Sequence, residues 1–99
     1  MIARIWRGAT AASDADAYAD YIRDTGLAEY RETDGNRGAW LLKRVDGDRA
    51  EFVALTFWDD MDAIRRFAGD EPERAVYYPE DEHFLVERED RVSHFELIE

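Results

Sequence analysis

The stretch that decides the fold is Phe52-Val53-Ala54-Leu55-Thr56-Phe57-Trp58, in which Thr56 is the only polar residue. Its aromatic and β-branched composition predicts a strand over residues 49–58. A strand with one solvated face alternates between apolar and polar residues, and this run does not, so we expect both of its faces to be covered. In a chain of 99 residues one set of helices covers one face, so a second subunit is the expected cover of the other.

A second strand precedes this run and is joined to it by a tight turn. Residues 39–45 are rich in apolar side chains, and Asp46-Gly47-Asp48 separates them from residue 49. An Asp-Gly dipeptide between two apolar segments is a strong hairpin signal. These residues therefore predict two adjacent antiparallel strands.

A helix is predicted before the hairpin. Ser13 is a favourable N-cap and Gly26 a natural C-terminal stop, with one extra turn over residues 27–30. The expected buried face has helical spacing and consists of Tyr18, Tyr21, Ile22 and Thr25.

Further helices are predicted after the hairpin. Asp59 or Asp60 caps a helix that ends at Gly69. Its apolar face consists of Met61, Ile64, Phe67 and Ala68. A short helix is expected from residue 71 or 72 to residue 77, stopped by Pro79.

Residues 1–8 and 91–98 are the remaining predicted strands, and residues 84–86 form a short extended piece before the last one. The resulting order is strand, helix, strand, strand, helix, strand. It predicts the α+β class, as a ferredoxin-like split βαβ sandwich with a four-stranded antiparallel sheet. Because no repeat or linker interrupts the chain, residues 1–99 are expected to form a single domain.

Composition excludes several classes of function. The chain has 24 acidic against 13 basic residues, a net charge of −11, which disfavours nucleic acid and anionic membranes as partners. It has no cysteine, which excludes disulfides and thiolate chemistry. No apolar stretch approaches the ~20 residues of a membrane helix, and no signal peptide is evident, so a cytoplasmic location is expected. Lys43 is the only lysine, which fits either a high-salt cytoplasm or a GC-rich genome.

Only two histidines are candidates for proton transfer near neutral pH. His94 lies among apolar residues in the last predicted strand, and it is either a hydrogen-bonded core or interface residue or a proton acceptor and substrate anchor. His83 follows Glu80 by three residues, a spacing found at carboxylate metal sites. There is no second such pair, so we interpret this segment as a solvated acidic loop and predict no metal site.

Aromatic residues indicate either a pocket for a flat ligand or an ordinary core. Trp6, Trp40 and Trp58 belong to three different predicted strands, and Tyr77 and Tyr78 lie on the segment expected to cross over them.

Two arginines lie in strand interiors, where an unpaired buried cation is costly. Arg4 and Arg44 are each expected to reach solvent or to pair with a carboxylate or an anionic ligand, and the structural carboxylate pair is the favoured interpretation. No phosphate-binding or dinucleotide-type glycine motif is present. Ser13 and Ser93 are the only serines, and neither lies in a nucleophile-elbow motif, which argues against covalent hydrolysis.

Segments spread over essentially the whole chain carry a resemblance to a known family. They are Ala3-Arg4-Ile5-Trp6-Arg7-Gly8, Gly35-Asn36-Arg37-Gly38, Leu55-Thr56-Phe57-Trp58-Asp59-Asp60, Ile64-Arg65-Arg66-Phe67-Ala68-Gly69 and Ala75-Val76-Tyr77-Tyr78-Pro79-Glu80-Asp81. With these segments the chain resembles the antibiotic-biosynthesis-monooxygenase-like family of the dimeric α/β-barrel superfamily. The resemblance implies a homodimer in which two sheets pack face to face, which would cover the second face of residues 52–58.

The resemblance also implies an activity. Relatives of this type oxygenate polycyclic phenols or anthrones without metal or flavin. The resemblance therefore implies a small phenol, quinol or anthrone-like substrate and no cofactor. We accordingly expect His94 as the catalytic base or substrate anchor, with substrate-binding residues Trp6, Trp58, Tyr77 and Arg4. Trp58 matches the family's tryptophan at the end of the third strand.

Two family positions differ, and they leave other functions open. The asparagine that oxygenase and haem-degrading members place on the first strand is replaced by the stretch holding Arg4 and Trp6, and Arg74-Ala75-Val76 stands where haem-degrading members carry a histidine. Haem degradation is therefore not expected. The alternatives are a non-catalytic small-molecule-binding or stress-related dimer and a cofactor-free isomerase or cyclase.

Overall fold

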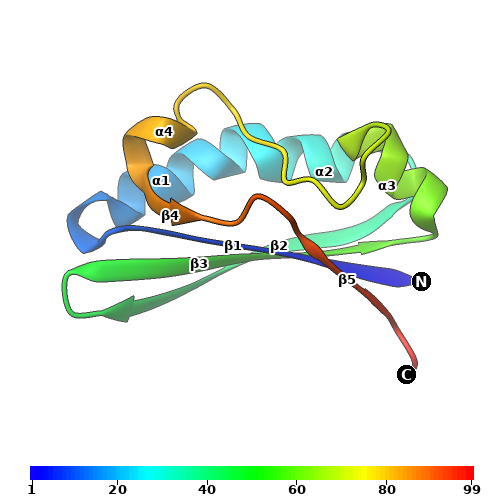
Figure 1. Ribbon diagram of the computed structural model, residues 1–99, viewed down its shortest axis with the longest axis horizontal. Helices are drawn as coiled ribbons and strands as arrows, with labels where there is room; N and C mark the ends of the chain where they lie inside the picture. Colours follow the sequence, from blue (N-terminus) through cyan, green and yellow to red (C-terminus); the bar gives the residue numbers. More distant parts are fainter.

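One antiparallel sheet and one layer of helices make up the computed structural model, which describes residues 1–99 (Figure 1). The elements are β1 (Ile2–Ala11), α1 (Ala15–Ile22), α2 (Ala28–Glu32), β2 (Asn36–Asp46), β3 (Arg49–Trp58), α3 (Met61–Ala68), α4 (Asp81–Phe84), β4 (Leu85–Arg88) and β5 (Ser93–Glu96). The strand order is β2-β3-β1-β4, and β5 also pairs with β1. This arrangement confirms the predicted ferredoxin-like α+β fold.

The fourth position of the sheet is shared by two short strands. β4 pairs with residues 8–10 of β1, and β5 pairs with residues 2–5. The sheet therefore has five strands in the four predicted positions. β1 is longer than the predicted strand over residues 1–8 because its far end also pairs with β3.

The hairpin is confirmed. β3 has the predicted bounds, and β2 extends beyond the predicted residues 39–45 at both ends. Gly47 has a φ of +63° in the two-residue turn, a conformation that side chains with a Cβ rarely adopt.

The prediction that Gly26 ends the first helix is wrong. The chain passes through a π turn (Arg23–Leu27) and continues as α2 to Glu32. This continuation buries Leu27 and Tyr30 against the sheet, and that burial outweighs the low helix propensity of glycine. Ser13 does not cap the helix either, because it lies within a 3-10 turn (Ala12–Asp14).

The second predicted helix is confirmed as α3. The Asp60 side chain accepts a hydrogen bond from the Ala63 backbone N–H at 2.9 Å, and Gly69 ends the helix at a φ of +86°. The short helix predicted over residues 71–77 is wrong. Residues 70–80, which we call the strap, form no helix, because Arg74 bridges to Arg91 and backbone bonds tie this segment to the C-terminal region.

The two faces of the sheet differ in cover. All helices lie on one side, which we call the inner face, and the other side, the outer face, is bare in the single chain (Figure 1). β3 accordingly alternates between buried inner residues and half-buried outer residues. The inner core includes Phe52, Trp58, Ile64 and Tyr18. No helix in the structure has the length and apolar character needed to cross a membrane.

Candidate functional site

Arg4 is the most unusual residue of the inner face. It lies in the middle of β1 and is 1% exposed. Its Nη2 donates to the Arg74 carbonyl at 3.0 Å, its guanidinium carbon lies 5.4 Å from the centre of the Phe67 ring, and its Nε has no partner. The favoured prediction of a carboxylate partner is wrong for Arg4. It is confirmed for Arg44, which pairs with Glu51 on the outer face.

Burial changes the electrostatics of Arg4. Loss of water lowers the pKa of its guanidinium, and the neighbouring Tyr30 hydroxyl partly offsets this change. An arginine side chain nevertheless stays charged in proteins. Arg4 is therefore a buried cation whose surroundings supply a carbonyl, a hydroxyl and an aromatic ring but no anion.

His94 lies directly beside Arg4, since the two residues are register partners in the β1–β5 pairing. Its Nε2 atom is buried and has no hydrogen-bond partner. Burial and the charge of Arg4 lower the pKa of His94 below its usual 6.5, whereas Glu73 acts in the opposite direction. The imidazole is therefore neutral at pH 7, and a neutral imidazole has one nitrogen that can accept a proton.

Trp6 and Tyr77 form a second contact between β1 and the strap. The Trp6 indole N–H donates to the Tyr77 hydroxyl at 2.9 Å, and the two rings pack edge to face with centres 6.2 Å apart. The Tyr77 hydroxyl in turn donates to the Glu89 carbonyl, and the Arg88 guanidinium carbon lies 4.4 Å from the Tyr77 ring centre. The strap is thus fastened over the inner face beside Arg4.

Trp58 is fully buried in the same layer. Its indole N–H donates to the Thr56 hydroxyl at 2.8 Å. Its ring packs against Phe67 and Tyr30, with centres 5.9 and 6.3 Å away. Phe67 contacts both Trp58 and Arg4, and so connects the aromatic cluster to the buried cation.

The structure brings the sequence-predicted site residues to one side of the sheet. Arg4 and Trp6 share the inner face of β1, Trp58 lies on β3, His94 on β5 and Tyr77 on the strap. Their arrangement combines a cation, a neutral imidazole and aromatic rings, with Arg4, Trp6 and Trp58 buried and Tyr77 and His94 half-buried.

Two further aromatic residues of the strands and strap lie elsewhere. Trp40 is 51% exposed on the outer face, against Phe57. The Tyr78 hydroxyl binds the Glu29 carboxylate, which ties the strap to α2.

Sequence reasoning did not include Tyr30 and Phe67 among the site residues. Tyr18, Ile22 and Tyr30 have helical spacing, so Tyr30 lies on the buried helical face if the helix continues through Gly26. Because Gly26 was predicted to end the helix, Tyr30 was not assigned to its buried face. Phe67 was predicted as a core residue of α3, and nothing in its local sequence indicates the contact with Arg4.

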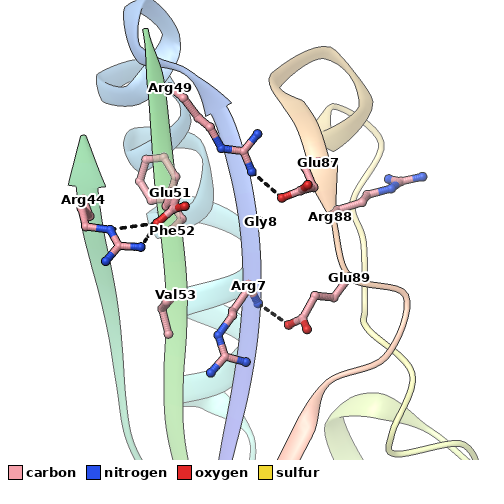
Figure 2. A pocket seen from close by; sticks show the side chains of 10 residues that line it. All are labelled: Arg7, Gly8, Arg44, Arg49, Glu51, Phe52, Val53, Glu87, Arg88 and Glu89. Carbon is pink, nitrogen blue, oxygen red and sulfur yellow. Dashed lines mark hydrogen bonds and ion pairs between the residues drawn. The ribbon is translucent and has the colours of Figure 1, made fainter. Parts of the chain in front are cut away.

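The outer face carries a separate, charged hollow of about 440 Å³ (Figure 2). Arg44 pairs with Glu51 and Arg49 with Glu87 across it, and Figure 2 shows Arg88 pointing away. These ionic groups are exposed and largely matched within the chain. The hollow therefore lacks the buried, unpartnered polar atoms of the inner face. No group of three or more His, Asp or Glu residues is placed to hold a metal ion.

No protein-family model and no curated protein matches the sequence. Solved structures do match over nearly the whole chain. One is a single-residue mutant of MhuD with two manganese protoporphyrin IX molecules bound per active site, at 19% identity and a TM-score of 0.59, over 99% of this chain and 95% of that one.

Two further structures are similar. Rv0793 from Mycobacterium tuberculosis has a TM-score of 0.62 at 19% identity, over 99% of this chain and 95% of its own. An uncharacterized NIPSNAP domain protein from Burkholderia xenovorans has a TM-score of 0.59 at 18% identity, over 98% and 94%. MhuD and Rv0793 have the antibiotic-biosynthesis-monooxygenase-like fold, so these comparisons confirm the fold that the resemblance implies.

Proposed function

We propose that this protein is a homodimer that binds a small aromatic molecule at the inner face and oxygenates it without a cofactor. The observation that carries the proposal is the buried, unpartnered Nε2 of a neutral His94 beside the buried cation Arg4. A partly buried aromatic layer that contains a free base suits the ionisation of a weakly acidic phenol, quinol or anthrone.

The reaction begins with proton transfer to His94. Nε2 takes a proton from the hydroxyl or the acidic CH₂ of the substrate, and the resulting electron-rich anion reduces dioxygen, which is the co-substrate. In an anthrone the CH₂ group becomes a carbonyl, so that one oxygen atom enters the product and the other leaves as water. Trp6, Tyr77 and Trp58 serve as pocket walls that exclude water from the anion.

The comparisons support a flat ligand as the substrate class. MhuD, which has the same fold, binds a porphyrin in its active site. We transfer from it only the planar aromatic character of the ligand, and not its identity. A porphyrin is not proposed, because Arg74-Ala75-Val76 stands where haem-degrading members carry a histidine.

Homodimer formation is supported by the outer face. Trp40, Leu42 and Phe95 are about half exposed there. Trp40 and Leu42 on β2 are register partners of half-buried residues of β3, and Phe95 on β5 is the register partner of Ala3 on β1. A contiguous apolar surface of this kind marks an interface. A second copy packed face to face would cover it and would give a mass near 23 kDa, twice the 11.5 kDa of the chain.

Sedimentation tests the dimer and the effect of salt. At −11 per chain the subunits repel each other, so association should tighten between low and molar salt. A mass of 11.5 kDa in both conditions would contradict the dimer.

Oxygen uptake tests the reaction. Wild-type protein with an anthrone should consume dioxygen and place one labelled oxygen atom in the product. His94→Gln should lower this rate by at least about 100-fold, as removal of a general base does. His83→Gln, which changes the exposed histidine of α4, should leave it unchanged.

The same assay separates the alternatives. Tight ligand binding with no oxygen uptake would indicate a non-catalytic binding protein. A product of unchanged mass would indicate an isomerase. An unchanged rate in His94→Gln would show that His94 is not the base.

A further inference from the structure

Arg4 stands out because it has no counter-ion although the chain contains 24 acidic residues. Exposed arginines such as Arg37 and Arg65 pair with nearby aspartates, whereas Arg4, at 1% exposure, takes part in no ion pair. Its Nη2 is bonded to a backbone carbonyl and its Nε to nothing. A charge in this state lacks the partner that would compensate its loss of water.

A second unmatched polar atom lies on the neighbouring strand. His94 Nε2 is buried without a partner, and the register pairs His94 with Arg4. Phe67 and Tyr30 line the same region with aromatic rings 4.6 Å apart, centre to centre. An oxygen anion attached to an aromatic ring would supply the missing charge to Arg4, an acceptor for a protonated His94 Nε2, and a stacking surface for the rings.

We infer that Arg4 and His94 form the binding site for the oxyanion of a planar aromatic acid, and that the strap covers this site until the ligand displaces it. This inference deepens the proposed function by naming the substrate class, and it rests only on ligand binding and not on oxygen chemistry.

The strap occupies the place that the ligand would take. The Arg74 carbonyl accepts a hydrogen bond from the Arg4 guanidinium, so an oxyanion at this position would replace a neutral acceptor with a charged one. Other polar contacts also hold the strap, and a ligand that displaces it must break them. Two are backbone bonds, from Ala75 N–H to the Asp90 carbonyl at 2.9 Å and from Val92 N–H to the Glu73 carbonyl at 2.8 Å. The others are the Tyr77 hydroxyl bonds to Trp6 and Glu89, the Tyr78 bonds to Glu29 and Asp81, the Glu80 N–H bond to the Tyr21 hydroxyl and the Arg91–Glu73 ion pair.

Two features suit the strap for movement. Gly69, just before its start, has a φ of +86°, and no atom lies within 4 Å of an added Cβ there, so the chain is uncrowded at this position. Glu73, the acidic residue that acts on His94, belongs to the strap. Displacement of the strap therefore removes a negative charge from the site as the anion enters.

Calorimetry under argon tests the ligand class with three matched probes: 2-naphthoate, 2-naphthol and naphthalene. At pH 7 the first is an anion, the second a neutral phenol and the third has no oxygen. We expect naphthoate to bind at least about 10-fold more tightly than naphthalene, the range for a charge-assisted hydrogen bond. If naphthol binds tightly as the phenolate and releases no proton to the buffer, the oxyanion is a phenolate whose proton is held by His94. Equal binding of all three probes would overturn the inference.

Variants locate the site. Arg4→Gln should weaken naphthoate binding by about 10- to 100-fold and leave naphthalene binding unchanged. Arg65→Gln removes the same charge from the exposed face of α3 and should change neither. Unchanged naphthoate binding in a folded Arg4→Gln protein would overturn the inference. The comparison of probes on the wild-type protein tests the ligand class even if this variant does not fold.

The strap is tested by kinetics. Tyr78→Phe removes its bond to Glu29 and should raise the association rate of naphthoate severalfold. An association rate that does not change would overturn the covering role of the strap. Because dioxygen is absent, binding can succeed where oxygenation fails, and the two proposals remain distinguishable.

Discussion

The two faces of the sheet differ in which kind of group is left without a partner. On the inner face the apolar side chains are fully packed, but Arg4 and His94 keep polar atoms without partners. On the outer face the charged residues are paired, as in Arg44–Glu51, but apolar side chains such as Trp40 are exposed. The inner face thus has polar atoms that a small anion would satisfy, and the outer face has apolar side chains that an apolar partner surface would cover. One sheet can therefore have a ligand site on one side and a subunit interface on the other.

The largest expected effect is the loss of subunit association through the outer face. Leu55→Asp places a carboxylate in the middle of β3 on that side, and a symmetric dimer would bury it twice. The sedimenting mass should fall from about 23 to 11.5 kDa at micromolar protein concentration. Ala17→Asp adds the same charge on the exposed side of α1 and should leave the dimer intact. A dimeric Leu55→Asp protein would show that this face is not the interface.

The next largest effect is an opposite change in protein stability and in ligand binding when Arg4 is replaced. Arg4→Met keeps most of the side-chain volume but removes the uncompensated cation, so the free energy of unfolding without ligand should rise by about 1–3 kcal/mol. Urea denaturation measures this change, and naphthoate binding should be lost in the same protein. A destabilised variant would mean that the carbonyl, hydroxyl and ring around Arg4 already compensate its charge.

A smaller effect concerns the hydroxyl that joins the strap to β1. Tyr77→Phe leaves the buried Trp6 N–H and the Glu89 carbonyl without this partner, which should lower the free energy of unfolding by about 1–3 kcal/mol. Tyr21→Phe is the control, because the Tyr21 hydroxyl accepts an exposed bond from Glu80 N–H at 3.2 Å. Equal losses in the two variants would show that the Trp6–Tyr77 contact is no stronger than an exposed one.

The smallest effect is a pH dependence from His94. Because its pKa is lowered in the folded protein, the unfolded chain binds the proton more readily. Stability is therefore undiminished above pH 6.5 and falls as the pH decreases below 6.5, until the folded pKa is passed. The difference in unfolding free energy between wild type and His94→Gln should rise between about pH 5 and pH 7.

The buried Asp81, whose pKa is raised by loss of water, also titrates in acid, but it is present in both proteins and cancels in this difference. A flat difference would show that Glu73 offsets the effect of burial on His94.

Much of the fold followed from short-range signals. The apolar run of β3, the Asp-Gly turn before it and the Asp60 cap of α3 each encode a conformation within a few residues. The structure has these elements where they were predicted. The failures occurred where distant partners outweighed local preference. Gly26 lies inside a continuous helical segment because Tyr30 is buried beyond it.

The strap is the second such failure. Pro72 and the residues after it predicted a short helix, but the bonds of Ala75 and Val92 align this segment with the C-terminal region instead. A helix of one or two turns has little stability of its own, so pairing with another segment decides its conformation.

Local patterns in the chain were enough to predict the fold class, the exposed apolar strand face and the residue types available for chemistry. Arg4 and His94 were both recognisable as unusual, but their sequence positions are far apart. Only the pairing of β5 with the first half of β1 placed them side by side and left their polar atoms unmatched. The reason is that periodicity reports which face a side chain occupies, whereas strand order and register decide which side chains meet on that face.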